Sequence, residues 1–133
     1  MAKKNPEADE PIDPRLRPYV VVDFLLEQEL LFIVVQNFGA RPALEVSIKW
    51  EPTFRGLNGE QATCELPLFH NLTYLAPGRT IRTLLDTRQA YFQRDEPTRL
   101  TARLNYQDEY GQKYRQIIPH NLEIYRDLAE PFV

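Results

Sequence analysis

The chain has 133 residues, of which 43% are hydrophobic and 26% charged, and a formal net charge of −3. A chain of this length is expected to form one domain with one core, and its ordinary composition excludes a largely disordered or fibrous protein. Because nucleic-acid-binding proteins usually carry a basic excess, the acidic balance disfavours DNA and RNA as partners.

Cysteine content and hydropathy limit the compartment. Cys64 is the single cysteine, which excludes an internal disulfide and a two-cysteine zinc site and favours a reducing, cytoplasmic compartment. The start of the chain lacks the apolar region of a secretory signal. Acidic residues interrupt the most apolar stretch, residues 20–35, whereas a membrane-spanning helix needs about twenty nearly uninterrupted apolar residues. We therefore expect a soluble protein without a transmembrane segment.

Residues 1–18 form the first segment. They contain Pro6, Pro11, Pro14 and Pro18 among charged residues, and such a composition buries too little apolar area to offset the entropy lost on ordering. We expect a flexible, proline-rich, charged arm, which is either a solvated terminus or a second docking segment.

The folded region begins with the pattern of a hairpin. Two runs rich in β-branched and aromatic residues, 19–26 and 30–35, flank the polar break at 27–29, as antiparallel strands joined by a turn do. The second run is apolar on both faces, which is typical of a central strand. Residues 37–42 then supply the glycine and proline of a turn.

Residues 43–50 give the clearest strand pattern, because apolar and polar residues alternate along them. Trp50 ends the apolar row and is expected to be buried. Residues 51–61 predict a loop, residues 62–75 predict one short strand or a crossing between sheets, and residues 76–78 predict a tight turn.

The second half of the chain predicts further strands. Strand composition recurs in four segments, which are 79–87, 98–107, 113–118 and, past Pro119, 122–125. Residues 88–97 predict a loop or one helical turn, and residues 107–111 predict a hairpin turn.

These segments together predict an all-β domain. We expect an immunoglobulin-like antiparallel β-sandwich of seven or eight strands in residues 19–125, because short strands recur at sandwich-like spacing without any long helical period. Residues 126–133 form a tail that is one helical turn or disordered.

Three clusters carry a family resemblance. They are Asn37-x-Gly39-x-x-Pro42-Ala43 leading into Glu45-Val46-x-Ile48, then Leu75-Ala76-Pro77-Gly78, and then Tyr106-x-Asp108-x-x-Gly111-x-x-Tyr114. With these clusters the chain resembles bacterial and archaeal immunoglobulin-like accessory domains, such as the cell-adhesion-related CARDB-type modules. The resemblance implies that the clusters mark the passage from strand B to strand C, the approach to strand E, and the hairpin of strands F and G. It also implies a sandwich that presents loops or edges to a partner, but turn and core residues carry no activity themselves.

Two histidines and one cysteine are the candidates for metal binding or catalysis. His70 and His120 are far apart in the sequence with no third ligand at a fixed spacing, which favours exposed loop histidines over a metal site. No nucleophile motif surrounds Cys64, which favours an inert packing residue. An enzyme built on these residues would need their side chains within about 3 Å of each other or a shared metal. We therefore predict no catalytic residue, metal or cofactor.

A local bias towards arginine is the feature most suggestive of binding. The arginines are Arg79, Arg82, Arg88, Arg94, Arg99 and Arg103. Because guanidinium groups bind carboxylate or phosphate bidentately, this segment is a candidate site for an acidic partner, a nucleotide or single-stranded RNA, although a solvated strand face is the simpler interpretation. Among the tyrosines of the last hairpin, Tyr106 and Tyr114 are expected in the core and Tyr110 at the surface.

We therefore expect a non-catalytic interaction or accessory module that docks one protein partner by a sheet edge or by the loops after strands C and E. The predicted partner-binding residues are Arg79, Arg82, Arg88, Arg94 and Tyr110. The alternative is a small-ligand or carbohydrate-binding sandwich that uses exposed aromatic residues such as Trp50, Tyr91 and Tyr110. This alternative requires at least two of those rings exposed on one surface.

Overall fold

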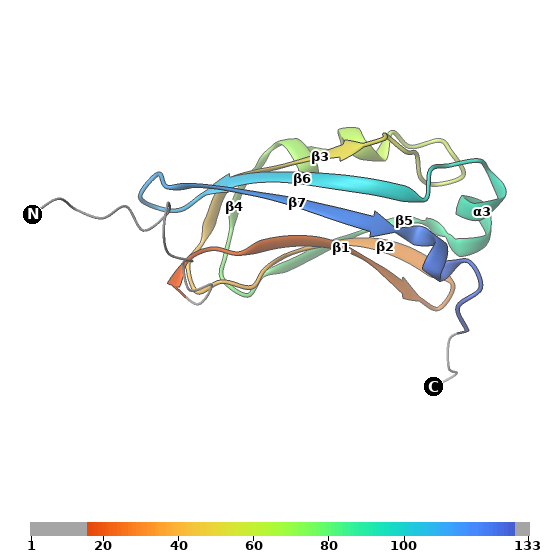
Figure 1. Ribbon diagram of the computed structural model, residues 1–133, viewed down its shortest axis with the longest axis horizontal. Coiled ribbons are helices and arrows are strands. Elements are labelled where there is room, and N and C mark those ends of the chain that lie inside the picture. The colour runs from red at the N-terminus through yellow and green to blue at the C-terminus, as the bar shows by residue number, and fades with distance from the viewer. Residues whose placement is uncertain (1–15, 130–133) are drawn as a thin grey trace, which may run out of the picture.

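Seven strands in two antiparallel sheets make up the computed structural model, which describes residues 16–129 (Figure 1). Sheet A has the order β1-β2-β5, with β1 (Val20–Glu27), β2 (Leu30–Asn37) and β5 (Thr80–Thr87). Sheet B has the order β4-β3-β6-β7, with β4 (Leu72–Leu75), β3 (Ala43–Glu51), β6 (Arg99–Gln107) and β7 (Lys113–Asn121). The predicted all-β sandwich is confirmed. The expected arm up to residue 15 and the last four residues of the expected tail lie outside the described residues.

The core lies between the two sheets, where the alternating apolar rows meet. Alternate residues of β6 are buried, and β3 is buried at alternate positions from Val46 to Trp50. The Trp50 side chain is 3% exposed, as predicted, and its ring centroid lies 5.5 Å from that of Phe24, 5.2 Å from that of Phe54 and 5.7 Å from that of Phe69. This aromatic cluster joins both sheets to the long connection between β3 and β4.

The two long connections contain short helices. Between β3 and β4 lie the 3-10 helix η2 (Thr63–Glu65) and the helix α2 (Pro67–His70), so the expected crossing at 62–75 includes helical turns before its strand. Between β5 and β6 lies α3 (Arg88–Gln93), which agrees with the predicted helical turn. The Thr87 hydroxyl accepts a hydrogen bond from Ala90 N at 3.0 Å and caps this helix.

The last strand differs from the sequence-based expectation. β7 continues through Pro119 to Asn121. The prediction of an eighth strand at 122–125 is wrong, because these residues form the 3-10 helix η3 (Leu122–Tyr125). Leu122 N donates to Thr98 O at 2.7 Å. With the register of the two strands, this bond means that the N–H and C=O groups of the even-numbered residues in β7 point towards β6. The nitrogen of Pro119 therefore points away from the ladder, where its missing N–H costs no hydrogen bond.

The buried side chain of Asn37 organises one end of the sandwich. Its Oδ1 accepts hydrogen bonds from Tyr19 N at 3.0 Å and Gly39 N at 2.9 Å. Its Nδ2 donates to Arg41 O at 2.8 Å and to Leu75 O at 3.1 Å. One side chain thus joins the approach to β1, the β2–β3 connection and the end of β4.

The sandwich includes the last two residues of the expected arm. Pro18 is buried, and Arg17 Nη2 donates to the Tyr106 hydroxyl at 2.9 Å while its guanidinium lies 4.2 Å from the ring centre of Tyr114. A Cβ on Gly39 would lie 1.9 Å from Arg17 O, so only glycine allows the segment to pack there.

The chain leaves the sandwich after η3. Residues 126–129, which belong to the expected tail, have no regular secondary structure. In the described part of the chain, no helix has the length and apolar character needed to cross a membrane.

Candidate functional site

The six clustered arginines are divided among three regions of the fold. Arg79 and Arg82 lie at the start of β5 and on it, Arg88 and Arg94 at the two ends of α3, and Arg99 and Arg103 on β6. Because β5 and β6 belong to opposite sheets, the segment does not form one arginine surface.

Arg82 lies on the outer face of sheet A. Its Nη1 is 3.2 Å from Glu27 Oε1, and its guanidinium lies 4.2 Å from the ring centre of Phe32. The side chain thus crosses the outer face from β5 to β1 above the central strand. Arg79, at the turn before β5, is exposed. Both side chains are available at the surface of sheet A.

The Arg88 side chain holds neighbouring segments of the fold together. Its side chain is 15% exposed, and it forms an ion pair with Glu29 in the β1–β2 turn. Its Nη1 also donates to Tyr125 O at 3.0 Å. Arg88 therefore ties the start of α3 to two other segments.

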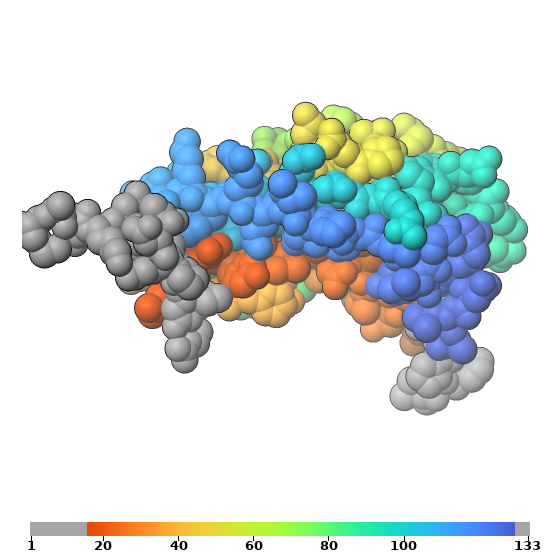
Figure 2. Space-filling view, viewed as in Figure 1, coloured from red at the N-terminus to blue at the C-terminus, as the bar shows by residue number. Residues whose placement is uncertain are grey.

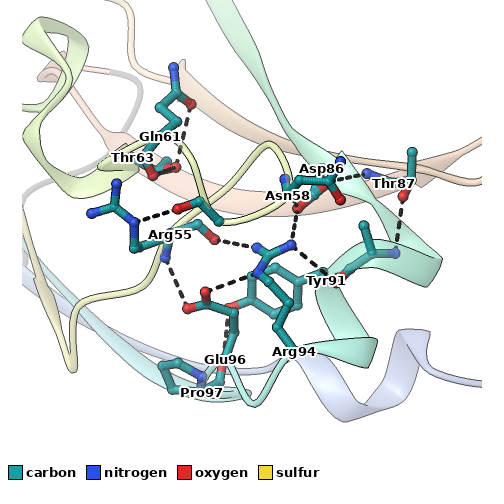
Figure 3. Close-up of polar contacts among 12 residues, drawn as sticks. Arg55, Asn58, Gln61, Thr63, Asp86, Thr87, Tyr91, Arg94, Glu96 and Pro97 are labelled. Carbon is teal, nitrogen blue, oxygen red and sulfur yellow. Dashed lines mark hydrogen bonds and ion pairs between the residues drawn. The ribbon is translucent and has the colours of Figure 1, made fainter.

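Arg94 is the centre of the network in Figure 3. Its Nη1 donates to Asp86 Oδ2 at 2.7 Å, its Nε to Glu96 Oε2 at 3.2 Å and its Nη2 to Arg55 O at 3.0 Å. Although burial opposes the charge, the bonds to the two carboxylates raise the pKa of Arg94. The guanidinium thus cross-links the connection after β3 to the connection after β5.

The partners of Arg94 are themselves held by the backbone. The carboxylate of Asp86 accepts hydrogen bonds from Asn58 N at 3.0 Å and Thr87 N at 2.8 Å (Figure 3). Beside it, the buried Tyr91 hydroxyl donates to Pro97 O at 2.7 Å, and burial raises its pKa. These contacts fix the two loops that the sequence offered as docking sites.

Tyr110 lies elsewhere, at the tip of the β6–β7 hairpin. Its side chain is 77% exposed, and its ring centre lies 5.6 Å from the guanidinium of Arg41, which is 3.1 Å from Glu109. The predicted surface position of Tyr110 is therefore correct, but the residue belongs to a different element from Arg79 and Arg82.

The sheet edges differ in how accessible their peptide groups are. Phe38 N donates to Tyr19 O at 2.8 Å, so the N–H and C=O groups of the odd-numbered residues in β1 point towards β2. The N–H and C=O groups of the even-numbered residues in β1 therefore point outward from the edge of sheet A. An edge of this kind can pair with another chain unless it is covered.

Side chains close the β1 edge. The Gln116 side-chain amide donates to Val20 O, and Val20 N donates to the Tyr106 hydroxyl at 3.2 Å. The Tyr125 hydroxyl donates to Phe24 O at 3.0 Å. Because side chains of sheet B and η3 already occupy these groups, β1 offers little to a partner strand.

Two other edges are protected in different ways. β7 carries Lys113, Arg115 and Pro119 at the positions whose peptide groups face outward, and both charge and proline discourage strand pairing. β4 has only four residues. Short edge strands are a common protection against pairing.

The β5 edge is the accessible one. Asn37 N donates to Arg79 O at 3.1 Å, so the peptide groups of the odd-numbered residues at the start of β5 point towards β2. The peptide groups of Thr80, Arg82 and Leu84 therefore point outward from the sheet edge. Within residues 16–129, no other element donates to or accepts from these groups. Leu57 N covers the far end by donating to Leu85 O at 2.8 Å.

An apolar row lies beside this edge on the outer face of sheet A. The register places Leu25 opposite Phe32 and Phe32 opposite Leu84, and we call these three side chains the apolar stripe. Leu25 and Leu84 are each more than a third exposed. Near Phe38 the same face forms a groove of about 260 Å³ that includes Val21. In the sequence, the run at 30–35 was the sign of this exposed row, because it is apolar on both faces of its strand.

Two of the three residues considered for catalysis are in contact, but the contact is made by the backbone of Cys64. Cys64 is buried, and burial raises the pKa of its thiol. His70 Nε2 lies 2.9 Å from the backbone oxygen of Cys64, not from its sulfur. His120 was expected in an exposed loop, which is wrong, because its even-numbered position on β7 faces inward. Among the residues that the structure describes, no three His, Cys, Asp or Glu side chains could together hold a metal ion.

The aromatic residues considered for ligand binding do not share a surface. Trp50 and Tyr91 are buried, and Tyr110 alone of the three is exposed. The requirement for two exposed rings on one surface is therefore not met by these residues.

Comparison with known proteins places the chain in a family without adding an activity. No curated protein matches the sequence, and no solved structure matches it. A family model described as a domain of unknown function, DUF8453, matches residues 4–126, which is most of the chain. The chain therefore belongs to the DUF8453 family.

Proposed function

We propose that this domain is a non-catalytic protein-interaction module that adds an extended segment of a partner to the β5 edge of sheet A. The contrast among the edges carries the proposal. β1 is closed by side chains, β7 carries charge and proline, and β4 is short, whereas β5 presents the peptide groups of Thr80, Arg82 and Leu84. Main-chain pairing at such an edge supplies affinity.

The apolar stripe supports the same edge. A partner strand beside β5 would extend sheet A, and its outward side chains would lie next to Leu84. An apolar residue of the partner at that position would cover an exposed hydrophobic surface. Arg79 and Arg82 are the predicted partner-binding residues at this edge, and Arg82 offers a charge for an acidic residue beside the apolar one.

The strand order supports an immunoglobulin-like assignment, which is part of the proposal. Sheet A corresponds to strands A, B and E, and sheet B to strands C′, C, F and G of such sandwiches. The three clusters of the resemblance lie at the β2–β3 connection, before β5 and around the β6–β7 hairpin. We infer a bacterial or archaeal accessory domain from the resemblance and a cytoplasmic setting from the single cysteine.

Two substitutions of Arg82 separate the backbone of the β5 edge from the side chain on the outer face of sheet A. Arg82→Pro removes an outward N–H together with the side chain, whereas Arg82→Ala removes the side chain alone. Ile117→Pro is the matched control because it removes an outward N–H from the β7 edge. The tagged wild-type domain and the three variants are used for affinity capture from native cells, and we expect a partner that is lost by Arg82→Pro and retained by wild type and Ile117→Pro, with Arg82→Ala retaining more of it than Arg82→Pro.

Hydrogen exchange then locates the contact. In the complex, the amides of Thr80, Arg82 and Leu84 are expected to become protected, because a partner strand would accept their hydrogen bonds. The proposal would be contradicted if no captured partner were both lost by Arg82→Pro and able to protect these three amides.

A further inference from the structure

The outer face of sheet B differs in chemistry from the rest of this acidic chain. The residues of β3, β6 and β7 that point outward are Ser47, Lys49, Glu51, Arg99, Thr101, Arg103, Asn105, Gln107, Lys113, Arg115, Ile117 and Pro119. We call this set the basic face. Figure 2 shows side chains of β6 and β7, in cyan and blue, projecting over a broad part of the surface.

Cations dominate the basic face. It holds five of them, against Glu51 and the neighbouring Glu45 at the β3 bulge, while the whole chain has a net charge of −3. The rest of the chain therefore carries the excess of acidic residues. A local surplus of one sign of charge steers partners of complementary charge.

The register brings the cations onto neighbouring strands. Lys49 lies opposite Arg103, Arg103 lies opposite Ile117, and Arg115 is two residues before Ile117 on β7. Side chains in such positions are about 5 to 7 Å apart, which is a spacing at which one extended acidic segment can meet several cations. Arg103 is held by Glu51 at 2.9 Å.

Three of the five cations form no ion pair with any residue that the structure describes. Within residues 16–129, no ion pair is formed by Lys49, Lys113 or Arg115, and all three side chains are exposed. A structural role of the kind that Arg94 has therefore does not account for them. Hydroxyl and amide groups between them, such as Thr101 and Asn105, add hydrogen-bond donors suited to carboxylates.

The same face lacks the features of other anionic partners. Binding of single-stranded nucleic acid relies on aromatic platforms, and Tyr74 on β4, at the opposite edge of the sheet from β7, is the aromatic residue on the outside of sheet B among the described strands. Docking on a membrane relies on several inserted apolar side chains, and Ile117 is the exposed aliphatic residue among the cations.

We propose that the basic face of sheet B binds an acidic segment of a protein partner, with Arg115, Lys113 and Lys49 as its principal contacts. Arginine meets carboxylates bidentately, and lysine adds charge without a fixed geometry. This site is on the sheet opposite the β5 edge, so the domain can hold two partners at once. The inference does not depend on strand addition at β5.

Fluorescence anisotropy tests the proposal with a labelled peptide of alternating glutamate and serine. The wild-type domain is expected to bind it, with affinity that falls as the salt concentration rises from about 50 to about 300 mM. Arg115→Glu is expected to weaken binding by about tenfold or more, because it replaces attraction with repulsion. Arg126→Glu is the matched control, since Arg126 is an exposed arginine beyond η3 and outside both proposed binding sites, and it is expected to leave binding within about twofold.

Two results would overturn the proposal, which are no binding of the peptide and equal binding by wild type and Arg115→Glu. Where the peptide does not bind, binding of phosphatidylserine vesicles or of a single-stranded RNA oligonucleotide would assign the basic face to a membrane or to RNA instead. Arg82→Pro keeps the two proposals apart, because it removes capture at the β5 edge while peptide binding at the basic face is expected to remain unchanged.

Discussion

The guanidinium of Arg94 lies 2.7 Å from Oδ2 of Asp86, a carboxylate that is 4% exposed. Arg94→Ala would leave this buried carboxylate without its cation, so we expect the free energy of unfolding to fall by about 3 kcal/mol. Urea denaturation of the two proteins measures this change.

Arg103→Ala is the control for that experiment. The ion pair between Arg103 and Glu51 has both side chains about half exposed, and exposed pairs contribute less than about 1 kcal/mol. Equal losses in the two variants would show that the Arg94 network does not fix the loops.

The hydroxyl of Tyr106 accepts hydrogen bonds from three donors: Arg17 Nη2 at 2.9 Å, Val20 N at 3.2 Å and Gln116 Nε2 at 2.9 Å. Tyr106→Phe removes this shared acceptor at the closed β1 edge and leaves Val20 N without a partner, whereas Gln116 still donates to Val20 O. We expect a loss of about 1 to 3 kcal/mol in the free energy of unfolding.

Hydrogen exchange adds a local measure of the same variant, because the amide of Val20 loses its acceptor and is expected to exchange faster. Tyr110→Phe is the control, since the Tyr110 ring is exposed, and it is expected to change stability by less than about 0.5 kcal/mol. An unchanged exchange rate at Val20 in Tyr106→Phe would contradict the capping role.

The elements that the sequence predicted best are those whose pattern is local. Alternation alone located β3 and β6, and turn residues located the β2–β3 connection and the β6–β7 hairpin. The break expected at Pro119 was wrong because proline is compatible with an edge position, and edge status depends on which strands are neighbours.

The candidate surfaces depended on contacts that sequence does not show. The arginine cluster was continuous in sequence, but β5 and β6 are on opposite sheets, which separates Arg82 from Arg103. Likewise, the closing of the β1 edge joins Val20 to Gln116 and Phe24 to Tyr125. Such long-range side-chain contacts leave no periodic signal in a single sequence.

Gly39 is the position at which an added methyl group is least tolerated. Its Cβ would lie 1.9 Å from Arg17 O and 2.8 Å from Pro18 Cα. Gly39→Ala must displace the segment that precedes β1, and we expect a loss of about 2 to 3 kcal/mol in the free energy of unfolding.

Gly111→Ala separates this steric effect from backbone strain. Gly111 has a φ of +85° but nothing within 4 Å of the added carbon, so its substitution is expected to cost about 1 kcal/mol. Thermal unfolding compares the two variants. A smaller loss for Gly39→Ala than for Gly111→Ala would show that the Arg17–Pro18 segment does not require the close approach.

His120 makes stability depend on pH. Its ring centroid is 5.1 Å from that of Phe24, and its Nε2 is buried without a hydrogen-bond partner among the described residues. Burial lowers the pKa of His120, and the attraction of Asp23, whose Oδ1 is 3.8 Å from Nδ1, opposes this only in part. The unfolded chain therefore takes up a proton at higher pH than the folded protein does.

The sign of the effect follows from this difference. Below the ordinary histidine pKa of about 6.5, protonation stabilises the unfolded state first, so the free energy of unfolding falls as the pH decreases and levels off below the folded pKa. Urea midpoints between about pH 8 and pH 5 are expected to show this fall in the wild type. His120→Phe, which cannot be protonated, is expected to remove most of it, and His70→Gln, at an exposed ring, is expected to preserve it. A pH dependence that persists in His120→Phe and disappears in His70→Gln would assign the effect to His70 instead.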